Sequence, residues 1–267
     1  HQAMQSWKNS DKATAARLFA NVANQDNIHS WKKAGAAFWA WRAYKASGDQ
    51  KTANHYLRKA AGEPRSFYGI LARRELKESL GLDKTPLTLS DSDVLEIIGE
   101  PAIRRVIALS EIGALEVAEK ELRTYFPTVS KNEQMRLLAL AHDLNLASVQ
   151  IAMARQLRDD KRPLDFARYP VPHWQPQEGF RIEPALIYAL ARQESGFHST
   201  AQSSAGAFGV MQLMPQTASL MKKQMQKNNG STIKAYHAGD AVTNVTLGQG
   251  YVEHLLGNAL VENNLLF

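Results

Sequence analysis

The sequence contains no cysteine, and this absence removes several kinds of chemistry at once. Without thiols the chain cannot form a disulfide, a thiolate metal site or a cysteine nucleophile. No apolar run approaches the roughly 18 residues that a membrane-spanning helix needs, so we expect no integral membrane segment. Runs of valine, isoleucine and threonine are scarce, whereas alanine and leucine are abundant. The composition therefore favours an all-α fold.

Acidic residues are also outnumbered by basic ones. The 32 lysines and arginines exceed the 26 acidic residues and give a formal net charge of +6. Such a balance suits an anionic partner, for example a polymer that bears carboxylates, although it also describes an ordinary solvated surface. The basic residues are scattered among acids and form no cluster interleaved with aromatic rings. We therefore expect no nucleic acid among the partners.

The region from 13 to 157 repeats one theme. Segments of roughly 10–15 residues, rich in alanine and leucine, alternate with short polar turns such as Ser47-Gly48-Asp49. Apolar side chains recur three and four positions apart, as in an amphipathic helix. Helix pairs of this kind stack into α-solenoids, although no strict repeat period is present. We expect helices over Ala15–Val22, Ala34–Ala46, Thr52–Ala61, Ser66–Leu80, Ser92–Leu109, Ala114–Phe126, Glu133–Leu144 and Ala147–Leu157.

A group of aromatic residues lies in the early part of this region. Its members are Trp31, Phe38, Trp39, Trp41 and Tyr44. Large aromatic side chains at helical spacing usually fill a core. We interpret the group as core, and a platform on which sugars stack is the alternative.

Four prolines lie close together at positions 163, 170, 172 and 176. Proline forbids a continuous helix and biases the preceding residue towards extended geometry. We therefore divide the chain into a solenoid and linker region over 1–162, a proline-rich connector over 163–179 and a second domain over 180–267. Trp174 is expected to pack the connector onto one of the two regions.

Directly after the connector, one predicted helix carries an acidic residue on its apolar face. Pro184 suits the first turn of a helix, and Gly196 suits its end. Within this helix Glu194 shares a face with Ile187 and Leu190. We expect its carboxyl group to be partly desolvated and near the negative end of the helix dipole, and both effects favour the protonated form. The alternative is a glutamate paired with an arginine or lysine at the helix end.

The 45 residues from 195 to 239 contain no aspartate or glutamate. Ordinary glycosidases need two carboxylates that flank the scissile bond, and the next acids here are Asp240, Glu253 and Glu262. A single acid suffices if the substrate supplies the rest. An N-acetyl oxygen can stabilise the cationic sugar centre, and the sugar's 6-hydroxyl can attack once the same carboxylate removes its proton. Glu194 is the candidate for this acid.

A glycine-containing turn follows, and its residue types suit a sugar-binding surface. Gly209 allows backbone to approach a ligand closely, and Pro215 begins a predicted helix over Gln216–Lys227. Ser203 and Gln212 carry hydroxyl and amide groups of the kind that hydrogen-bond sugar hydroxyls and acetamides. A purely structural turn is the alternative.

Two blocks of sequence closely resemble the signature of the soluble lytic transglycosylases. They are Ala191-Arg192-Gln193-Glu194-Ser195-Gly196-Phe197 and, after Ser203, Ala205-Gly206-Ala207-Phe208-Gly209-Val210-Met211-Gln212-Leu213-Met214-Pro215-Gln216-Thr217-Ala218. The segment from Asp240 to Tyr251 is similar to the family's next helix, so the resemblance covers about 182–256. The preceding helical region is similar in kind to the superhelical and linker domains of the large members.

The resemblance implies a lysozyme-like, mainly helical catalytic domain that acts on peptidoglycan. It implies cleavage of the β-1,4 bond between N-acetylmuramic acid and N-acetylglucosamine, which leaves a 1,6-anhydromuramoyl end. It implies that Glu194 is the catalytic acid and base and that Ser203 contacts the acetamide. The residues implied to line the glycan groove are Gly209, Gln212 and Met214. The resemblance also implies a periplasmic location, although the chain shows no signal peptide, and other cell-wall enzymes as partners.

The chain departs from the family pattern at its end. Family members continue into a segment reading Ala-Ala-Tyr-Asn-Ala-Gly, whose tyrosine and asparagine help to build the active site. Since this sequence has no such segment, we expect a catalytic domain truncated at its C-terminus, and the activity of this chain alone stays open.

Two other functions also stay open: a muramidase that hydrolyses the same bond with water, as goose-type lysozymes do, and a non-catalytic scaffold that binds glycan or protein. No metal or other cofactor is expected, because the histidines show no ligand spacing at His198, His237 and His254.

Overall fold

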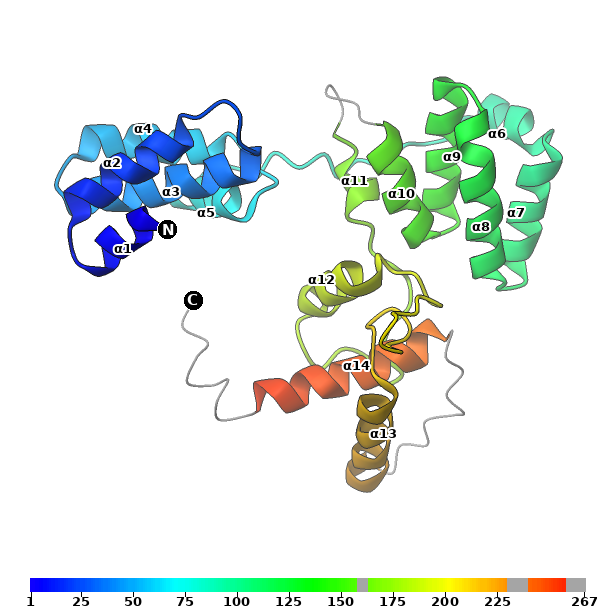
Figure 1. Ribbon diagram of the computed structural model, residues 1–267. Helices are drawn as coiled ribbons and strands as arrows, with labels where there is room; N and C mark the ends of the chain where they lie inside the picture. The colour runs from blue at the N-terminus through cyan, green and yellow to red at the C-terminus, as the bar shows by residue number, and fades with distance from the viewer. Residues whose placement is uncertain (158–162, 230–239, 258–267) are drawn as a thin grey trace. The chain divides into compact units, whose positions relative to one another are not determined.

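The computed structural model describes residues 1–157, 163–229 and 240–257 (Figure 1). The chain divides into two compact units, His1–Leu82 and Asp83–Phe267. Within the described ranges the regular structure is helical, and the extended residues form isolated bridges only. None of the helices in these ranges combines the length and the apolar character that crossing a membrane requires.

The first unit is a stack of helices in which consecutive members pack together. They are α1 (Gln2–Lys8), α2 (Lys12–Ala23), α3 (Ser30–Ala46), α4 (Gln50–Ala61) and α5 (Phe67–Leu76). Its core is rich in alanine, so the helix backbones can approach one another closely. α5 ends four residues earlier than the predicted Leu80 because Lys77 adopts a left-handed conformation that closes the helix.

The aromatic group on α3 is core with one exception. Phe38 and Trp41 are buried, and Trp39 packs against the same cluster while its indole donates to the Tyr68 hydroxyl over 3.1 Å. Trp31 is instead 65% exposed. The interpretation as core is therefore confirmed for the residues within α3 that contact this cluster, and it is wrong for Trp31.

The second unit begins with an array of helices. They are α6 (Asp91–Ile98), α7 (Pro101–Glu111), α8 (Leu115–Tyr125), the 3₁₀ turn Phe126–Thr128, α9 (Lys131–Asp143), α10 (Ala147–Leu157) and the short α11 (Asp165–Arg168). The single helix predicted over Ser92–Leu109 is wrong, because the chain breaks at Gly99 and restarts with Pro101 at the first position of α7. Proline lacks the N–H that a continuous helix would need there.

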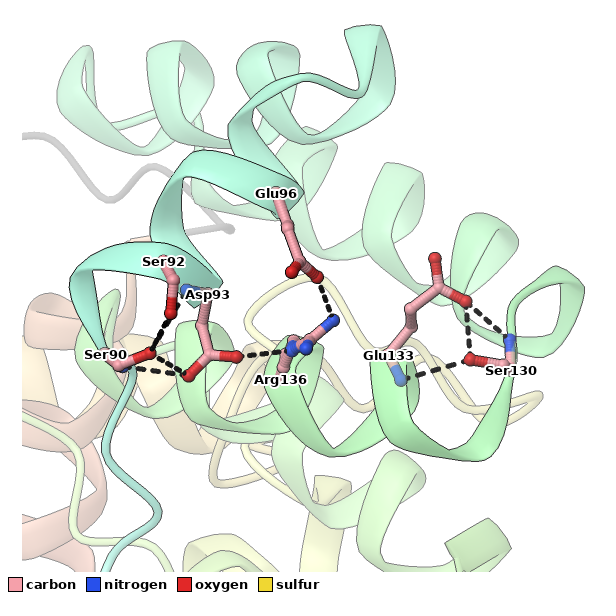
Figure 2. A network of polar contacts seen from close by, with 7 residues as sticks. All are labelled: Ser90, Ser92, Asp93, Glu96, Ser130, Glu133 and Arg136. Carbon is pink, nitrogen blue, oxygen red and sulfur yellow. Dashed lines mark hydrogen bonds and ion pairs between the residues drawn. The ribbon is translucent and has the colours of Figure 1, made fainter.

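One arginine on α9 holds α6 in place (Figure 2). The Arg136 Nε donates to Asp93 over 2.5 Å, and its Nη1 contacts Glu96 over 2.5 Å. Asp93 also accepts from the backbone N–H and the hydroxyl of Ser90, which forms a capping box at the start of α6. These hydrogen bonds from Ser90, and secondarily Arg136, lower the pKa of Asp93. The cap and one of the two ion pairs therefore share the Asp93 carboxylate.

The remaining helices of the second unit are α12 (Pro184–Ser195), α13 (Pro215–Asn229) and α14 (Ala241–Leu256). They share a core with the loop between α12 and α13, and two residues of α10, Ala147 and Ile151, belong to the same core. Trp174 packs the connector onto this group, as expected, through ring contacts with Tyr188 and Phe197. The predicted division at 1–162, 163–179 and 180–267 stays a prediction.

A mostly buried carboxylic acid, Glu119 on α8, lies against the start of α10. Its Oε1 accepts from the Ser148 N–H over 3.2 Å, and Arg123 donates to the Ser148 hydroxyl over 3.1 Å. Burial raises the pKa of Glu119 to about 7, against the opposing effects of Arg123 and of the Ser148 and Val149 backbone. Between the ordinary pKa of 4.5 and the raised pKa of about 7, the folded chain therefore keeps a proton at Glu119 that the unfolded chain has released.

This raised pKa predicts a pH dependence of stability. Between the ordinary value of 4.5 and about 7 the folded state binds more protons, so the free energy of unfolding should fall as pH rises. Glu119→Gln carries no titratable group and should remove this slope, which leaves the variant more stable than the parent above neutrality by up to about 3 kcal/mol. Urea unfolding at about pH 5 and about pH 8 measures the slope. Glu111→Gln, an exposed site on α7, is the control, and an unchanged slope in Glu119→Gln would contradict the assignment.

Candidate active site

Glu194 lies in the last turn of α12, whose limits agree with the prediction. The helix begins at Pro184, and Gly196 closes it in a left-handed conformation with φ of +62°. Among the described residues no hydrogen bond or ion pair engages the Glu194 carboxylate. The nearby Arg192 is directed elsewhere: its Nε donates to the Arg168 carbonyl over 3.0 Å, and its guanidinium lies over the Tyr169 ring. The alternative of a glutamate paired at the helix end is therefore wrong for the described part of the chain.

A groove of about 290 Å³ opens beside Glu194. Its walls come from α12, from the loop before α13, from the first turn of α13 and from the far half of α14. Most of the wall is apolar. The lining residues are Leu190, Glu194, Met211, Gln212, Leu213, Met214, Thr217, Gly248, Tyr251, Val252 and Leu255, among which Glu194 is the one carboxylate.

The Glu194 side chain is exposed in this groove. The expectation of a partly desolvated carboxyl is therefore wrong for this structure. Ile187 and Ala191, which are fully buried, define the face of α12 that packs into the core. Glu194 lies at the edge of that face and meets the open groove instead. The prediction that Glu194 is the acid is therefore supported by its place in the groove and not by burial.

Two of the predicted substrate-binding residues, Gln212 and Met214, also line the groove. Met214 is 42% exposed and can contact a ligand. Gln212 has a left-handed backbone with φ of +46°, and its Nε2 donates to the carbonyls of Ala201 and Gly209 over 2.9 and 3.0 Å. Non-glycine residues rarely adopt this conformation, so the two hydrogen bonds help to hold it.

The other two, Ser203 and Gly209, are not among the residues that line this groove. The Ser203 hydroxyl accepts from the Ala207 N–H over 3.0 Å and closes the turn before Phe208. Gly209 is buried with φ of +81°, and a Cβ at this position would collide with the side-chain amide of Asn244. The assignment of both residues to substrate binding stays a prediction, and their observed contacts shape the loop.

Asn244 on α14 is a residue that the sequence reasoning missed. It is fully buried, its Oδ1 accepts from the Met211 N–H over 2.8 Å, and its Nδ2 donates to the Phe208 carbonyl over 3.0 Å. From the other side, the Ser195 hydroxyl donates to the Val210 carbonyl over 2.9 Å. The loop that forms one wall of the groove is thus tied to α14 and to the end of α12.

The rest of the buried polar face of α14 holds the end of the connector. The Thr246 hydroxyl accepts from the Gln177 N–H over 2.9 Å. Gln249 accepts from the Arg181 N–H over 2.9 Å and donates to the Gly179 carbonyl over 3.2 Å. The sequence did carry a signal for these anchors: Asn244, Thr246 and Gln249 are polar residues inside the long, otherwise apolar helix α14.

The other acids considered from the sequence do not join Glu194. Asp240 caps α14 by accepting from the Val242 and Thr243 N–H groups. Glu253 pairs with Arg181 over 2.8 Å, and Glu262 lies outside the described residues. Within the described ranges no group of three or more histidine, aspartate or glutamate side chains could hold a metal ion.

Comparison with known sequences shows what this part of the chain is similar to. Residues 174–266 match the family model described as "Transglycosylase SLT domain". The soluble lytic murein transglycosylase of Salmonella typhimurium is 28% identical over 235 residues, and the alignment covers 80% of this chain and 34% of that protein. The protein of the same name from Escherichia coli K12 is 27% identical with the same coverage. Residues 174–266 are thus similar to a transglycosylase SLT domain, and the chain as a whole is similar to soluble lytic murein transglycosylases. It spans about a third of the length of these curated relatives.

Solved structures show the same fold. The 70 kDa soluble lytic transglycosylase SLT70 from Escherichia coli matches with a TM-score of 0.69 and 22% identity, covering 91% of this chain and 39% of that one. An inactive mutant of the lytic transglycosylase Slt from Pseudomonas aeruginosa matches with a TM-score of 0.68 and 21% identity, covering 97% and 41%. The prediction of an all-α fold with a lysozyme-like domain is confirmed.

The anchoring of the loop in this SLT domain can be tested by Asn244→Ala. The substitution leaves the buried Met211 N–H without its partner and takes one of two donors from the Phe208 carbonyl, which keeps the Leu213 N–H, so the free energy of unfolding should fall by about 2 kcal/mol. Urea unfolding monitored by circular dichroism measures the change. Asn132→Ala, on an exposed position of α9, is the control and should change stability by less than about 0.5 kcal/mol. Equal stabilities of the two variants would show that Asn244 is not the anchor.

Proposed function

We propose that this chain contributes the catalytic site of a peptidoglycan lytic transglycosylase, which cleaves the bond between N-acetylmuramic acid and N-acetylglucosamine without consuming water. One observation carries the proposal: Glu194 is the one carboxylate among the residues that line the groove, and it has no partner among the described residues. The names of the curated relatives, soluble lytic murein transglycosylases, support the same reaction class.

In the first step Glu194 acts as an acid. It gives its proton to the glycosidic oxygen while the bond from that oxygen to C1 of the muramic acid residue breaks. The N-acetylglucosamine part leaves with a free 4-hydroxyl. The acetamide oxygen of the muramic acid residue bonds to C1 and takes up the positive charge, so no protein nucleophile is required.

In the second step the resulting carboxylate acts as a base. It removes the proton of the C6 hydroxyl, the C6 oxygen bonds to C1, and the acetamide oxygen is released. The product is a 1,6-anhydro sugar, and Glu194 regains its proton, so the cycle closes with no water consumed. A hydrolytic glycosidase would need a second carboxylate across the bond, and the groove walls provide none among their lining residues.

The walls of the groove suit a sugar chain. Leu190, Val252 and Leu255 offer apolar surface for the faces of sugar rings, and Tyr251 and Gln212 offer polar groups. A bound glycan would displace the water that reaches Glu194, and exclusion of water favours the neutral, proton-donating form of a carboxylic acid. We assign Gln212 and Met214 to direct substrate binding.

The setting of the protein follows from the same proposal. Peptidoglycan carries lactyl-peptide carboxylates, which match the net charge of +6. The substrate would place the protein in the periplasm, where other cell-wall enzymes are its expected partners.

The proposal predicts that Glu194→Gln abolishes cleavage in the complete protein. Glutamine keeps the shape of the side chain but can neither donate the acidic proton nor accept one, so the rate should fall by about a thousandfold or more. Release of soluble muropeptides from peptidoglycan measures the rate, and sedimentation with insoluble peptidoglycan measures binding, which should be retained.

Glu253→Gln is the matched control, because Glu253 is a nearby acid that is paired with Arg181 and does not line the groove. This variant should cleave like the parent. Substantial cleavage by Glu194→Gln would overturn the proposal. Mass spectrometry of the products separates the reaction classes: ends heavier by one water would identify a hydrolase, and a parent that binds without cutting would identify a scaffold.

A further inference from the structure

The helix array of the second unit touches the loop that follows the catalytic helix. On α8, the Glu116 carboxylate accepts a hydrogen bond from the hydroxyl of Thr200, a residue 84 positions away in the chain. The Thr200 Oγ1 also lies 3.4 Å from Nδ1 of His198. Hydrogen bonds to an ionised carboxylate are among the strong ones. This contact lies at the surface and links the loop at Thr200 to a helix outside the groove.

Next to Thr200 stands the carbonyl group on which one groove wall depends. The Ala201 carbonyl oxygen accepts from the Gly209 N–H over 2.9 Å and from the Gln212 Nε2 over 2.9 Å. Gln212 lines the groove in a left-handed conformation that its surroundings must maintain. A shift of the Ala201 carbonyl would therefore displace Gln212 directly.

The helix that carries Glu116, α8, is itself attached through α10 to the core that α12 shares with α13 and α14. Glu119, one turn further along α8, accepts from the Ser148 N–H at the start of α10. α10 in turn contributes Ala147 and Ile151 to the core that holds α12. α8 is therefore a common support for the helix that bears Glu194 and for the loop that carries Gln212.

We propose that Glu116 is a positioning residue for the active-site groove, which acts through the Thr200 hydroxyl and the Ala201 carbonyl to hold Gln212 in place. The role concerns substrate binding, because the contacts of Glu116 lead to Gln212, which lines the groove. They do not lead to Glu194, which lies on α12. This inference rests on the proposed function for its kinetic consequence, whereas the contact itself is a property of the fold.

The test is Thr200→Val in the complete protein, which removes the hydroxyl and keeps the shape. We expect KM for soluble glycan strands to rise about fivefold, the effect of losing one solvent-exposed hydrogen bond, with kcat changed by less than about twofold. Glu116→Ala should raise KM by the same factor. Thr200→Ser keeps the hydroxyl group, so its KM should equal that of the parent. Glu121→Ala is the matched control, since Glu121 lies on the same helix but pairs with Arg105. An increase in KM for Glu121→Ala equal to that for Glu116→Ala would overturn the proposal.

Hydrogen exchange at the Gly209 amide provides a second readout that does not need activity. The Gly209 N–H donates to the Ala201 carbonyl, so it should exchange about fivefold faster in Thr200→Val and Glu116→Ala than in the parent. If the parent protein does not cleave peptidoglycan, the proposed function is refuted, but hydrogen exchange at Gly209 still tests the positioning role of Glu116. Parent-like exchange at Gly209 together with a parent-like KM in Thr200→Val would refute the positioning role.

Discussion

Two hydrogen bonds from one buried amide hold the wall of the groove. Asn244 satisfies the N–H of Met211 and the carbonyl of Phe208 at a point where the loop is buried. Burying the Met211 N–H unpaired would be costly, so this loop conformation needs a polar residue at position 244 of α14. Glycine is needed where the partners meet: Gly209 leaves room for the amide of Asn244, and Gly248 leaves room for Met211. The groove is thus a consequence of how α14 is packed.

Two carboxylic acids of the second unit show why burial alone does not identify a catalytic group. Burial raises the pKa of Glu119 to about 7, yet Glu119 lies between α8 and α10 and supports the fold. Glu194 is exposed, unpaired among the described residues and placed in a groove with apolar walls. A perturbed pKa marks a candidate, and access to a substrate-sized space decides between candidates. Glu119 therefore has the contacts of a structural residue, and Glu194 has the position of the proposed catalytic acid.

Local patterns predicted much of the fold and part of the site. Alanine-rich periodicity located most helices, and Pro184 and Gly196 bounded α12. The helix break at Pro101 and the exposure of Trp31 were missed, because periodicity alone does not reveal what a helix packs against. The role of Asn244 and the contact between Glu116 and Thr200 depend on residues far apart in the chain, which spacing cannot bring together. Gln212 and Met214 were placed in the groove, while Ser203 and Gly209 have structural contacts that only the folded loop shows.

The central claim is that one carboxyl group, in a groove that lacks a second among its lining residues, performs both proton transfers. A crystal structure of the Glu194→Gln variant with a bound glycan strand tests this claim most directly. The account predicts that the scissile oxygen lies within hydrogen-bonding distance of the side chain at 194, with the C6 hydroxyl on the reacting sugar within reach and no other carboxylate facing C1. A glycan bound outside this groove, or a second carboxylate positioned across the bond, would contradict it.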